Sequence, residues 1–549
     1  MESPTKRTLG PDRSLVFDLA EQARLRGDSP AIFYYGAEIN YAELWEQVQH
    51  LASHLKLRQG IVAGDRVAID LQNSPHYIIA YYAVLLAGGI VVPLNPMYRA
   101  EEVGIILKNS DAKIIVAAEN LLDRFTGWEG SGSLHIIVAR YASMLPQSTP
   151  CSLPEEMTCA AIDIDNDPRL TAWDTALETP ITESLTYTEI DIDAPAVMPY
   201  TSGSTGIPKG CLHTHRSVKH TAVAQVDWYN LSPQSVITAV QPLFHVAGMQ
   251  GSMNAAIYVG ASLLVLTRWD ADAAITMFAR HGVTFWNAPP TMVVDMMSRG
   301  SKVDAALKHV TIVTGGGSAM PEAVAARLKT EYQLDYIEGY GMSETMSPTH
   351  LNPMSAPRPG MIGITIQDTR ALIIDPETFT PLPDGEVGEI AVSGPQIMLG
   401  YWANPEADAE TFFEHQGQRF LRTGDLGLRE SDGYFRLVDR LKRMINASGF
   451  KVWPTEIESV IYAHDAVQSC CVIASPDPYR GESVKALVQL RPGAELSAPA
   501  LTTWLRERMA AFKVPRTIEF VGDLPLTATH KVNWRQLQER EKSSAAANT

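Results

Sequence analysis

Residues 200–210, with the sequence YTSGSTGIPKG, concentrate side chains and backbone that bind anions. Glycines permit positive φ angles and let backbone N–H groups converge on an anion. The hydroxyl side chains add donors and Lys209 adds a positive charge, a combination that suits a polyphosphate. The stretch is not a Walker A loop, because no Gly-Lys-Ser/Thr follows at the required spacing. A polar turn is the alternative, but the density of these groups favours a phosphate-binding loop.

Two later glycine-rich segments each carry a carboxylate. Glu344 follows the glycine turn in IEGYGMSET (residues 337–345), and a carboxylate that faces a nucleotide requires a cation between the two. Asp425, in RTGDLG (residues 422–427), can accept two vicinal O–H donors, which suits a ribose. Taken singly, the first segment is more typical of a helix N-cap and the second of a turn.

Composition restricts the class of protein. The chain has 549 residues, 45% of them hydrophobic and 19% charged, which indicates a folded protein of several domains. The net charge is −17 and no long basic run occurs, so bulk nucleic-acid binding is disfavoured. The five cysteines are odd in number and irregularly spaced, so a disulfide framework or zinc site is disfavoured. The first residues lack the apolar core of a signal peptide, and we expect a cytoplasmic protein.

The order of apolar runs predicts the elements that must position these groups. Residues 61–118 alternate as β-α-β-α-β, and a similar run covers residues 262–317, so we expect two α/β lobes with parallel sheets. The uncharged run 77–94 predicts a buried helix, a glycine stop and a buried strand rather than a membrane span. The acidic stretch 146–196 predicts an irregular surface connection. The chain becomes β-rich after about residue 360, and a last α+β unit begins near residue 441.

The motifs together resemble the acyl-adenylate-forming (AMP-binding) enzyme superfamily, and most of all its fatty acyl-CoA synthetases. TSGSTGIPKG is similar to the phosphate loop of that family, and ordered matches run from about residue 15 to residue 537. The resemblance implies an α/β N-terminal domain, residues 1–439, made of two α/β lobes and a small β-barrel-like subdomain. It also implies a hinge at residues 440–443 and a small mobile α+β C-terminal domain at residues 444–549.

The resemblance also implies roles for individual residues. The catalytic set would be Lys531, Glu344, Thr201 and His245, with Mg²⁺ held at Glu344 and Thr205. The residues implied to bind ATP or CoA are Ser202, Gly203, Ser204, Thr205, Gly206, Lys209, Gly315, Gly316, Gly317, Tyr340, Gly341, Met342, Ser343, Thr345, Asp425, Arg440, Lys442, Ser448 and Gly449. Lys442 matches the hinge position, and Ser448 and Gly449 match the turn along the pantetheine path. The pattern departs at His530, where the family has a glycine before its lysine, because a non-glycine residue adopts left-handed backbone at more cost.

PLFHVAGMQGSM (residues 242–253) resembles the acyl-pocket segment of the family, and FWNAPP (residues 285–290) is expected to form another pocket wall. His245 would lie beside the substrate carboxylate. No Asp occurs in the first segment to hold an ammonium group, so an amino acid substrate is disfavoured. Small and flexible residues there, Ala247, Gly248, Met249 and Gly251, predict a deep apolar slot.

The sequence therefore predicts an ATP-dependent acid–thiol ligase. It would activate an apolar carboxylic acid, preferably a medium- or long-chain fatty acid, as acyl-AMP and transfer the acyl group to CoA. Alternatives are an aryl-CoA ligase, a stand-alone adenylating enzyme that loads a carrier-protein thiol, and a regulatory nucleotide-binding protein without catalysis, for which His530 is the only support. We expect ATP, Mg²⁺, CoA and the acid as partners, no nucleic acid and no stable membrane insertion, and a homodimer stays open.

Overall fold

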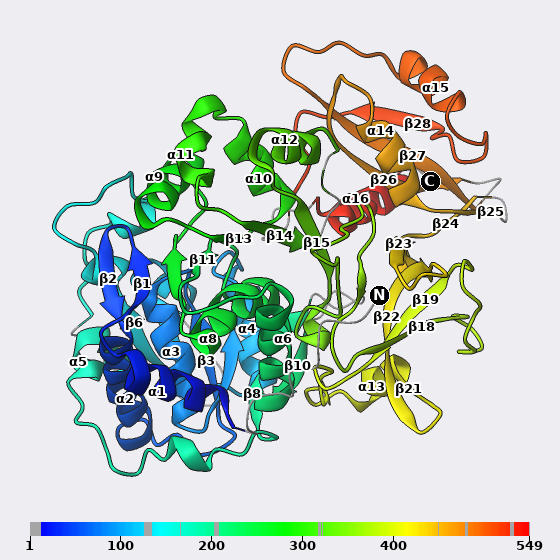
Figure 1. The fold of residues 1–549 in the computed structure, drawn as a ribbon. Coiled ribbons are helices and arrows are strands. Elements are labelled where there is room, and N and C mark those ends of the chain that lie inside the picture. Colours follow the sequence, from blue (N-terminus) through cyan, green and yellow to red (C-terminus); the bar gives the residue numbers. More distant parts are fainter. Residues whose placement is uncertain are drawn as a thin grey trace. The chain divides into compact units, whose positions relative to one another are not determined.

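The structure is a computed structural model (Figure 1). It describes residues 13–125, 134–164, 166–201, 208–316, 320, 322–447, 450–477, 481–526 and 532–547. Over these residues the chain forms two compact units. The first holds the chain up to Arg370 together with Ser393–Phe412, and the second holds Ala371–Val392 and the chain from Phe413 onward.

The first unit contains a sheet in which most neighbouring strands run parallel. In spatial order its strands are β20 (Gly400–Tyr401), β10 (Lys209–Thr214), β8 (Pro195–Val197), β4 (Ile90–Pro93), β3 (Arg66–Asp70), β5 (Ile114–Ala118), β6 (His135–Ala139) and β7 (Leu170–Ala172), and β9 (Tyr200–Thr201) pairs with β10. β10 is antiparallel to β8, β9 and β20. The antiparallel edge around β10 brings residue 401 beside residues 209–214.

Another sheet of the same unit carries the glycine-rich motifs. In spatial order its strands are β17 (Ile364–Thr365), β16 (His350–Leu351), β15 (Tyr336–Tyr340), β14 (Ile312–Gly316), β13 (Phe285–Asn287), β11 (Val236–Ala239), β12 (Ser262–Val265), β1 (Pro30–Tyr34) and β2 (Ala37–Asn40). The strands from β15 to β1 are parallel to their neighbours. The α/β fold with parallel sheets that the sequence predicts is confirmed, although the hairpin β1–β2 joins this sheet from far away in the chain.

Helices cover these sheets. They are α1 (Leu15–Arg26), α2 (Tyr41–Leu57), α3 (Pro75–Leu86), α4 (Ala100–Ser110), α5 (Trp173–Leu177), α6 (His215–Trp228), α7 (Val246–Gly248), α8 (Ala255–Val259), α9 (Ala271–His281), α10 (Pro290–Met297), α11 (Val303–Leu307), α12 (Glu322–Tyr332) and α13 (Pro405–Thr411). α3 is buried along its whole length, which explains its uncharged sequence. The Ser74 hydroxyl caps α3, Pro75 begins it, and Gly88 follows it with φ +87°. The helix, glycine stop and strand predicted for residues 77–94 are confirmed, and no helix in the described part of the chain could span a membrane.

The prediction that residues 146–196 form only an irregular surface connection is wrong. β7 extends the first sheet by pairing in parallel with β6, and α5 follows it directly. Met157 and Trp173 are each only 3% exposed within the core of the unit. Apolar residues in this acidic stretch therefore anchor it to the sheet.

The second unit is built from two sheets, in which most neighbouring strands run antiparallel, and a few helices. One sheet contains β18 (Arg370–Ile374), β19 (Gly388–Ser393), β22 (Gln418–Arg429), β21 (Phe412–His415) and β23 (Phe435–Arg440). The other contains β25 (Phe450–Val452), β24 (Ile445–Ala447), β27 (Gly481–Leu490), β26 (Val467–Asp477) and β28 (Thr517–Phe520). α14 (Pro454–Tyr462), α15 (Ala498–Arg506) and α16 (Trp534–Ala547) pack with this second sheet. The β-rich part and the terminal α+β part that the sequence predicts are confirmed.

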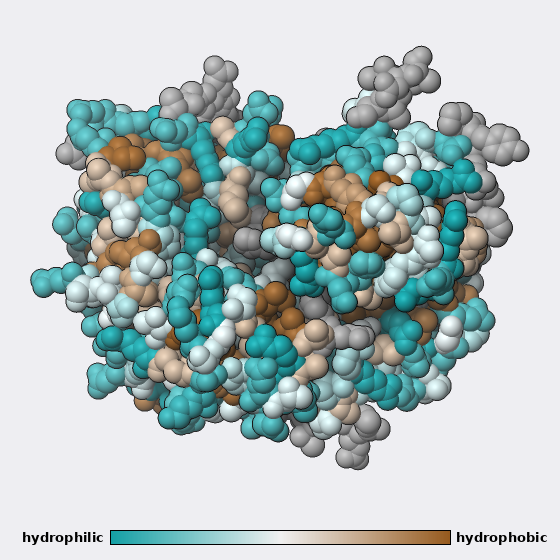
Figure 2. Space-filling view, turned by 90° about the horizontal axis from the view of Figure 1, so that it is seen from above, coloured by the Kyte–Doolittle hydropathy of each residue, from teal (hydrophilic) through white to brown (hydrophobic). Residues whose placement is uncertain are grey.

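The molecular face drawn in Figure 2 is covered mainly by hydrophilic residues, with apolar residues in small separate groups. Apolar residues scattered in this way are ordinary on a protein surface. The functional groups are therefore best sought at the ends of strands and in the turns that follow them.

Candidate active site

The predicted phosphate loop connects the two strands of a hairpin. Thr201 in β9 pairs with Lys209 in β10, and Tyr200 pairs with Gly210. This antiparallel pairing fixes both ends of the connection. The predicted donors Ser202, Gly203, Ser204, Thr205 and Gly206 lie outside the described residues.

Two further motifs lie side by side at the ends of β14 and β15. Gly315 pairs with Glu338, and Gly316 pairs with Gly339. A Cβ on Gly316 would lie 2.3 Å from the Gly339 carbonyl oxygen, and one on Gly315 would lie 2.0 Å from that of Ala288. These glycines therefore allow a close backbone approach, as the sequence predicts, while Gly317 lies outside the described residues.

β15 ends at Tyr340, and residues 341–345 form the turn that carries Glu344. The turn includes a short 3₁₀ helix, Ser343–Thr345, in which the Thr345 hydroxyl accepts a hydrogen bond from the Met342 N–H at 3.1 Å. A Cβ on Gly341 would lie 2.8 Å from the Pro348 Cα, so a side chain there would collide with the chain that follows. Local bonds and close packing thus fix the turn.

His213 fastens this turn to strand β10. Its Nε2 lies 2.8 Å from the Ser343 carbonyl oxygen, and its Nδ1 lies 3.1 Å from the Ser217 hydroxyl. Complete burial lowers the pKa of His213 to about 4. The ring is therefore neutral at physiological pH and donates from Nε2 to Ser343. His213 connects the strand that begins with Lys209 to the turn that carries Glu344.

Tyr401 makes a second connection between these two groups. Its hydroxyl donates to Glu344 Oε1 at 2.8 Å, and the Lys209 Nζ lies 5.0 Å from the centre of its ring. Glu344 is only 7% exposed. Burial, followed by the negative charge of Glu344, raises the pKa of Tyr401, so the phenol keeps its proton. The structure thus brings Lys209 and Glu344 to one place, as the resemblance implies.

The Glu344 carboxylate fits the chemistry of a magnesium site. A buried carboxylate held by a hydrogen bond supplies a hard oxygen ligand in a fixed orientation. No cluster of three or more acidic, His or Cys side chains that could hold a metal occurs in the described ranges. A single carboxylate suits Mg²⁺ bound to a nucleotide, because substrate phosphates and water complete its shell. Thr205, the other predicted contact, lies outside those ranges.

His245 begins the segment predicted to line the acyl pocket. It is the N-cap of α7, and its Nδ1 accepts a hydrogen bond from the Ala247 N–H at 3.3 Å. The chain continues from α7 through a π-helix, Met249–Asn254, into α8. A π-helix within an α-helix often marks a functional site. His245 is partly exposed, whereas the π-helix is buried throughout.

The glycines of this segment do not open a slot. A Cβ on Gly248 would lie 2.3 Å from the Pro242 carbonyl oxygen. A Cβ on Gly251 would lie 2.6 Å from Asn287 Nδ2 and 2.7 Å from Gln225 Oε1. The prediction that small residues leave apolar space is therefore wrong at both positions, because packing already fills that space.

Buried amides join the two predicted pocket walls. Asn287, from the FWNAPP wall, donates to the Ala247 carbonyl oxygen and to the Ser252 hydroxyl, each at 3.3 Å, and accepts from Gln241 Nε2 at 2.8 Å. Asn287 is 5% exposed, and Gln250 is fully buried with no partner for its Nε2 among the described residues. The walls thus meet at polar groups that can donate and accept hydrogen bonds.

Asp425 and Arg440 belong to the second unit and lie opposite each other on β22 and β23. Asp425 is 2% exposed, and it follows Gly424, which has φ +70°. The Gly424 N–H donates to Glu389 Oε1 at 2.9 Å, and Arg422 donates to Glu389 Oε2 at 2.7 Å. Glu389 therefore organises the turn that presents Asp425. For Arg440 only the backbone is described.

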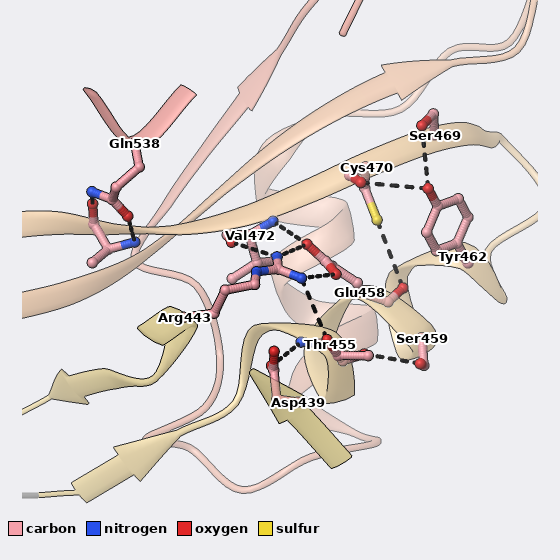
Figure 3. A network of polar contacts seen from close by, with 11 residues as sticks. Asp439, Arg443, Thr455, Glu458, Ser459, Tyr462, Ser469, Cys470, Val472 and Gln538 are labelled. Carbon is pink, nitrogen blue, oxygen red and sulfur yellow. Dashed lines mark hydrogen bonds and ion pairs between the residues drawn. The ribbon is translucent and has the colours of Figure 1, made fainter. Parts of the chain in front are cut away.

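The predicted hinge has an anchored residue at each end (Figure 3). Before it, Asp439 accepts a hydrogen bond from the Thr455 N–H at 2.8 Å, at the start of α14. At its last residue, Arg443 donates to Glu458 Oε2 at 3.2 Å and to the Val472 carbonyl oxygen at 3.1 Å. Lys442 itself lies in a 3₁₀ turn, Leu441–Arg443, and only its backbone is described. Ser448, Gly449 and Lys531 lie outside the described residues.

Sequence reasoning missed the residues that hold the site together. His213, Tyr401 and Glu389 stand in no glycine-rich motif, and each acts on a segment far away in the chain. The sequence signal that could have indicated Tyr401 is a residue with a polar hydroxyl in the two-residue strand β20, which pairs with β10. That signal has a meaning only once the strand pairing is known.

Known proteins match the chain over most of its length. The AMP-binding enzyme family matches residues 19–402, and the AMP-binding enzyme C-terminal domain matches residues 456–531. The long-chain-fatty-acid–CoA ligase of Bacillus subtilis (strain 168) is 32% identical over 537 residues, which are 97% of this chain and 95% of that protein. The feruloyl-CoA synthase of an Amycolatopsis species is 29% identical and covers 94% of this chain and 97% of its own.

Among solved structures, ATP-bound MatB from Rhodopseudomonas palustris is similar at a TM-score of 0.82 with 27% identity. It covers 96% of this chain and 99% of its own. Both family matches occur in the order that the motifs predict. The chain therefore belongs to the AMP-binding enzyme family.

Proposed function

We propose that this acyl-CoA ligase activates an organic acid with an apolar body as acyl-AMP, releases pyrophosphate, and transfers the acyl group to CoA. The observation that supports this best is that Tyr401 contacts both charged groups, with Lys209 over its ring and Glu344 at its hydroxyl. Among the described residues, Lys209 and Glu344 lie near each other without forming an ion pair. A cation available for phosphates, and a carboxylate able to hold Mg²⁺, suit a reaction in which two anions must meet.

The first step joins a carboxylate to ATP, and mutual repulsion opposes it. Lys209, the hydroxyls from Thr201 to Thr205, and Lys531 would neutralise the phosphates and the acid, while His245 would lie beside the acid. Mg²⁺, held at Glu344 and by the substrate phosphates, would supply further charge neutralisation. The carboxylate oxygen attacks the α-phosphorus in line, a P–O bond forms, and pyrophosphate leaves with its electron pair. Positioning and charge stabilisation supply most of the rate.

The resemblance assigns several residues to the nucleotide. Tyr340 and the backbone from Gly341 to Ser343 would border the adenine, beside Gly315 and Gly316. Asp425 would accept hydrogen bonds from the ribose hydroxyls, and Arg440 would contact ribose or phosphate. Their cross-strand pairing supports a joint role for Asp425 and Arg440.

The second step brings a thiolate to the same carbonyl carbon while water is kept out. We place the hinge at residues 440–443, between an N-terminal domain at 1–439 and a mobile C-terminal domain at 444–549. Rotation about Lys442 would withdraw Lys531 and bring Ser448 and Gly449 against the thiol arm. Arg443, the last residue of this hinge, is bonded to α14 and β26 of the proposed C-terminal domain, which supports a boundary directly after it.

A medium- or long-chain fatty acid is the first choice of substrate. A long-chain-fatty-acid–CoA ligase is among the relatives above 30% identity and matches nearly the whole chain. An aryl acid is the second choice, and two observations favour it: a feruloyl-CoA synthase matches almost as well, and the glycines of the pocket segment are tightly packed. Five unpaired cysteines support a reducing cytoplasm as the location.

The decisive experiment measures pyrophosphate release with acids of graded length and aromaticity, with and without CoA. We expect acid-dependent release that also requires Mg²⁺, and faster turnover when CoA is added. Replacing free CoA by a holo-carrier protein tests the alternative acceptor. Purified enzyme that releases no pyrophosphate with any acid would refute the proposal.

Lys531→Ala tests the division between the two steps. We expect the variant to lose acyl-AMP formation and to retain thioester formation from supplied acyl-AMP. Equal loss of both steps would contradict the role proposed for Lys531.

A further inference from the structure

We infer that Tyr401 is a positioning residue of the adenylation step: its hydroxyl orients the Glu344 carboxylate, and its ring holds the Lys209 ammonium in place. This inference rests on the proposed function, because it takes Lys209 and Glu344 as the groups that face the phosphates and their Mg²⁺.

The contacts of Tyr401 divide between two parts of one side chain. The hydroxyl donates to Glu344 Oε1 at 2.8 Å, whereas the Lys209 Nζ lies 5.0 Å from the ring centre. The hydroxyl supplies the hydrogen of the first contact, because an ionised carboxylate can only accept. The aromatic face attracts the ammonium but carries no net charge, so it does not neutralise the cation as a carboxylate would. One residue can therefore hold both charged groups.

The backbone of Tyr401 is fixed to the strand that begins with Lys209. Tyr401 pairs with Cys211 across β20 and β10, and the Trp402 N–H donates to the Gly210 carbonyl oxygen at 2.7 Å. The Tyr401 N–H donates to Asp408 Oδ1 at 2.7 Å. These bonds leave the ring little freedom to follow a mobile partner.

The same segment also holds the turn that carries Glu344. The Met398 N–H donates to the Glu344 carbonyl oxygen at 3.0 Å, and the Leu399 N–H donates to the Leu212 carbonyl oxygen at 2.8 Å. Residues 398–402 therefore bind both the backbone of Glu344 and strand β10. The Tyr401 hydroxyl adds a contact to the carboxylate itself, which is the group that a metal ion would meet.

The surroundings explain why a neutral ring is needed here. The buried Cys211 thiol lies near the charges of Glu344, Lys209 and Asp408, and burial followed by the Glu344 charge raises its pKa. In such a region an ammonium and a carboxylate attract each other strongly. In the described ranges Lys209 forms no ion pair with a carboxylate, and its ammonium lies over Tyr401. The ring thus keeps the Lys209 charge available for the phosphates.

Two variants separate the two parts of the side chain. Tyr401→Phe keeps the ring and removes the hydroxyl, so we expect the apparent affinity for Mg²⁺ in acid-dependent pyrophosphate release to fall about tenfold, as when a hydrogen bond to a metal ligand is lost. The KM for ATP at saturating Mg²⁺ should stay within about twofold. Tyr401→Leu also removes the cation–π contact and should raise that KM a further two- to fivefold.

Tyr332→Phe is the matched control. Tyr332 donates to Asp304 Oδ1 at 2.7 Å, so the same chemical change is made at a tyrosine–carboxylate pair away from the site. Its Mg²⁺ dependence should equal that of the parent enzyme. A loss of Mg²⁺ affinity in this variant as large as in Tyr401→Phe would overturn the inference.

A binding measurement removes the dependence on turnover. Mn²⁺ prefers the same oxygen ligands as Mg²⁺, and its electron paramagnetic resonance signal reports the enzyme-bound Mn²⁺–ATP complex. We expect Tyr401→Phe to weaken this complex about tenfold and to leave metal-free AMP binding, measured by calorimetry, unchanged. In a Glu344→Gln background Tyr401→Phe should add no further loss, because it acts through Glu344. Equal Mn²⁺–ATP affinity in Tyr401→Phe and the parent enzyme, or a full additional loss in the Glu344→Gln background, would overturn the inference.

These outcomes are distinct from a failure of the proposed function. An enzyme that releases no pyrophosphate with any acid contradicts the proposed reaction, and the Mn²⁺–ATP measurement then decides the role of Tyr401 by itself. An active enzyme whose Tyr401→Phe variant keeps full metal affinity contradicts the role of Tyr401 alone.

Discussion

The buried ion pair at the last residue of the proposed hinge should be more costly to break than to remove. Arg443 and Glu458 are 12% and 14% exposed, so the ordinary weak surface pair is the wrong comparison. The Glu458 carboxylate accepts hydrogen bonds from both terminal nitrogens of Arg443 and, at 2.7 Å, from the Val472 N–H. The pair therefore joins the turn after Lys442 to α14 and β26 (Figure 3).

The expected magnitudes follow from these contacts. Glu458→Ala leaves the Arg443 charge and the Val472 N–H without their acceptor, which should cost about 4 kcal/mol. Arg443→Met leaves the Glu458 charge with the Val472 N–H as its remaining donor, and should cost about 3 kcal/mol. The double variant Arg443→Met/Glu458→Leu buries no unpaired charge. It loses the acceptor of one N–H and should cost only about 2 kcal/mol, which is less than either single variant.

Hydrogen exchange of the amides in β26 measures this local stability directly. Peptides from β3, in the other compact unit, serve as an internal reference that none of the substitutions touches. We expect the double variant to lose the least protection in β26, Arg443→Met to lose more, and Glu458→Ala to lose the most. Protection in β3 should not change. Losses in the double variant equal to the sum of the two single losses would refute the reasoning, because independent contacts are additive.

The pair should also affect catalysis. The Arg443 guanidinium lies 5.5 Å from the Trp534 ring centre, and Trp534 begins α16 three residues after Lys531. Arg443→Met should therefore slow adenylation at temperatures where the protein is still folded. Unchanged adenylation in a folded variant would show that the start of α16 does not depend on Arg443.

Three further predictions concern the hinge, the acid and pH. Lys442→Pro fixes φ and removes an N–H, so it should spare adenylation and slow thioester formation in stopped-flow assays; two unchanged rates would contradict the hinge position. Asn287→Leu removes an amide from the junction of the pocket walls. The ratio of kcat/KM for unsubstituted acids to kcat/KM for hydroxylated acids should rise about tenfold. An unchanged ratio in a competition assay would exclude Asn287 from the acid site. Burial lowers the pKa of His213 to about 4 in the folded protein. Below about pH 6.5, His213 therefore binds a proton in the unfolded chain but stays neutral in the folded chain. Unfolding free energy should fall with decreasing pH, and His213→Gln should reduce that slope by up to ~1.4 kcal/mol per pH unit between pH 6 and 5, measured by urea unfolding; an equal slope in both proteins would contradict the burial of a neutral ring.

Local patterns in the sequence predict most of the elements. The strand at 66–70 and the helix at 75–86 follow from an apolar run, a Ser-Pro start and a glycine stop. The adjacent positions of the glycine motifs follow from parallel pairing of β14 with β15. Such features depend on a few neighbouring residues, and for that reason the sequence is sufficient.

Long-range pairing is what the sequence leaves open. The hairpin β1–β2 joins β12 across more than two hundred residues, and Tyr401 reaches Glu344 through a strand of two residues. The prediction of an apolar slot from small residues was wrong for a related reason. Gly251 can indicate open space or close packing, and only the position of Asn287 and Gln225 against it decides which is true.

The two lysines of the proposed site differ in how the chain holds them. Lys209 starts a strand that is paired on both sides, and Tyr401 is fixed to the same strand, so its charge cannot leave the phosphate loop. Lys531 belongs to the other compact unit. A charge that serves both half-reactions can be built into the sheet, whereas a charge needed only to bring two anions together must be removable before a thiolate approaches. The proposed chemistry would therefore use one fixed and one mobile cation, and we propose Lys209 for the first role and Lys531, which lies outside the described residues, for the second.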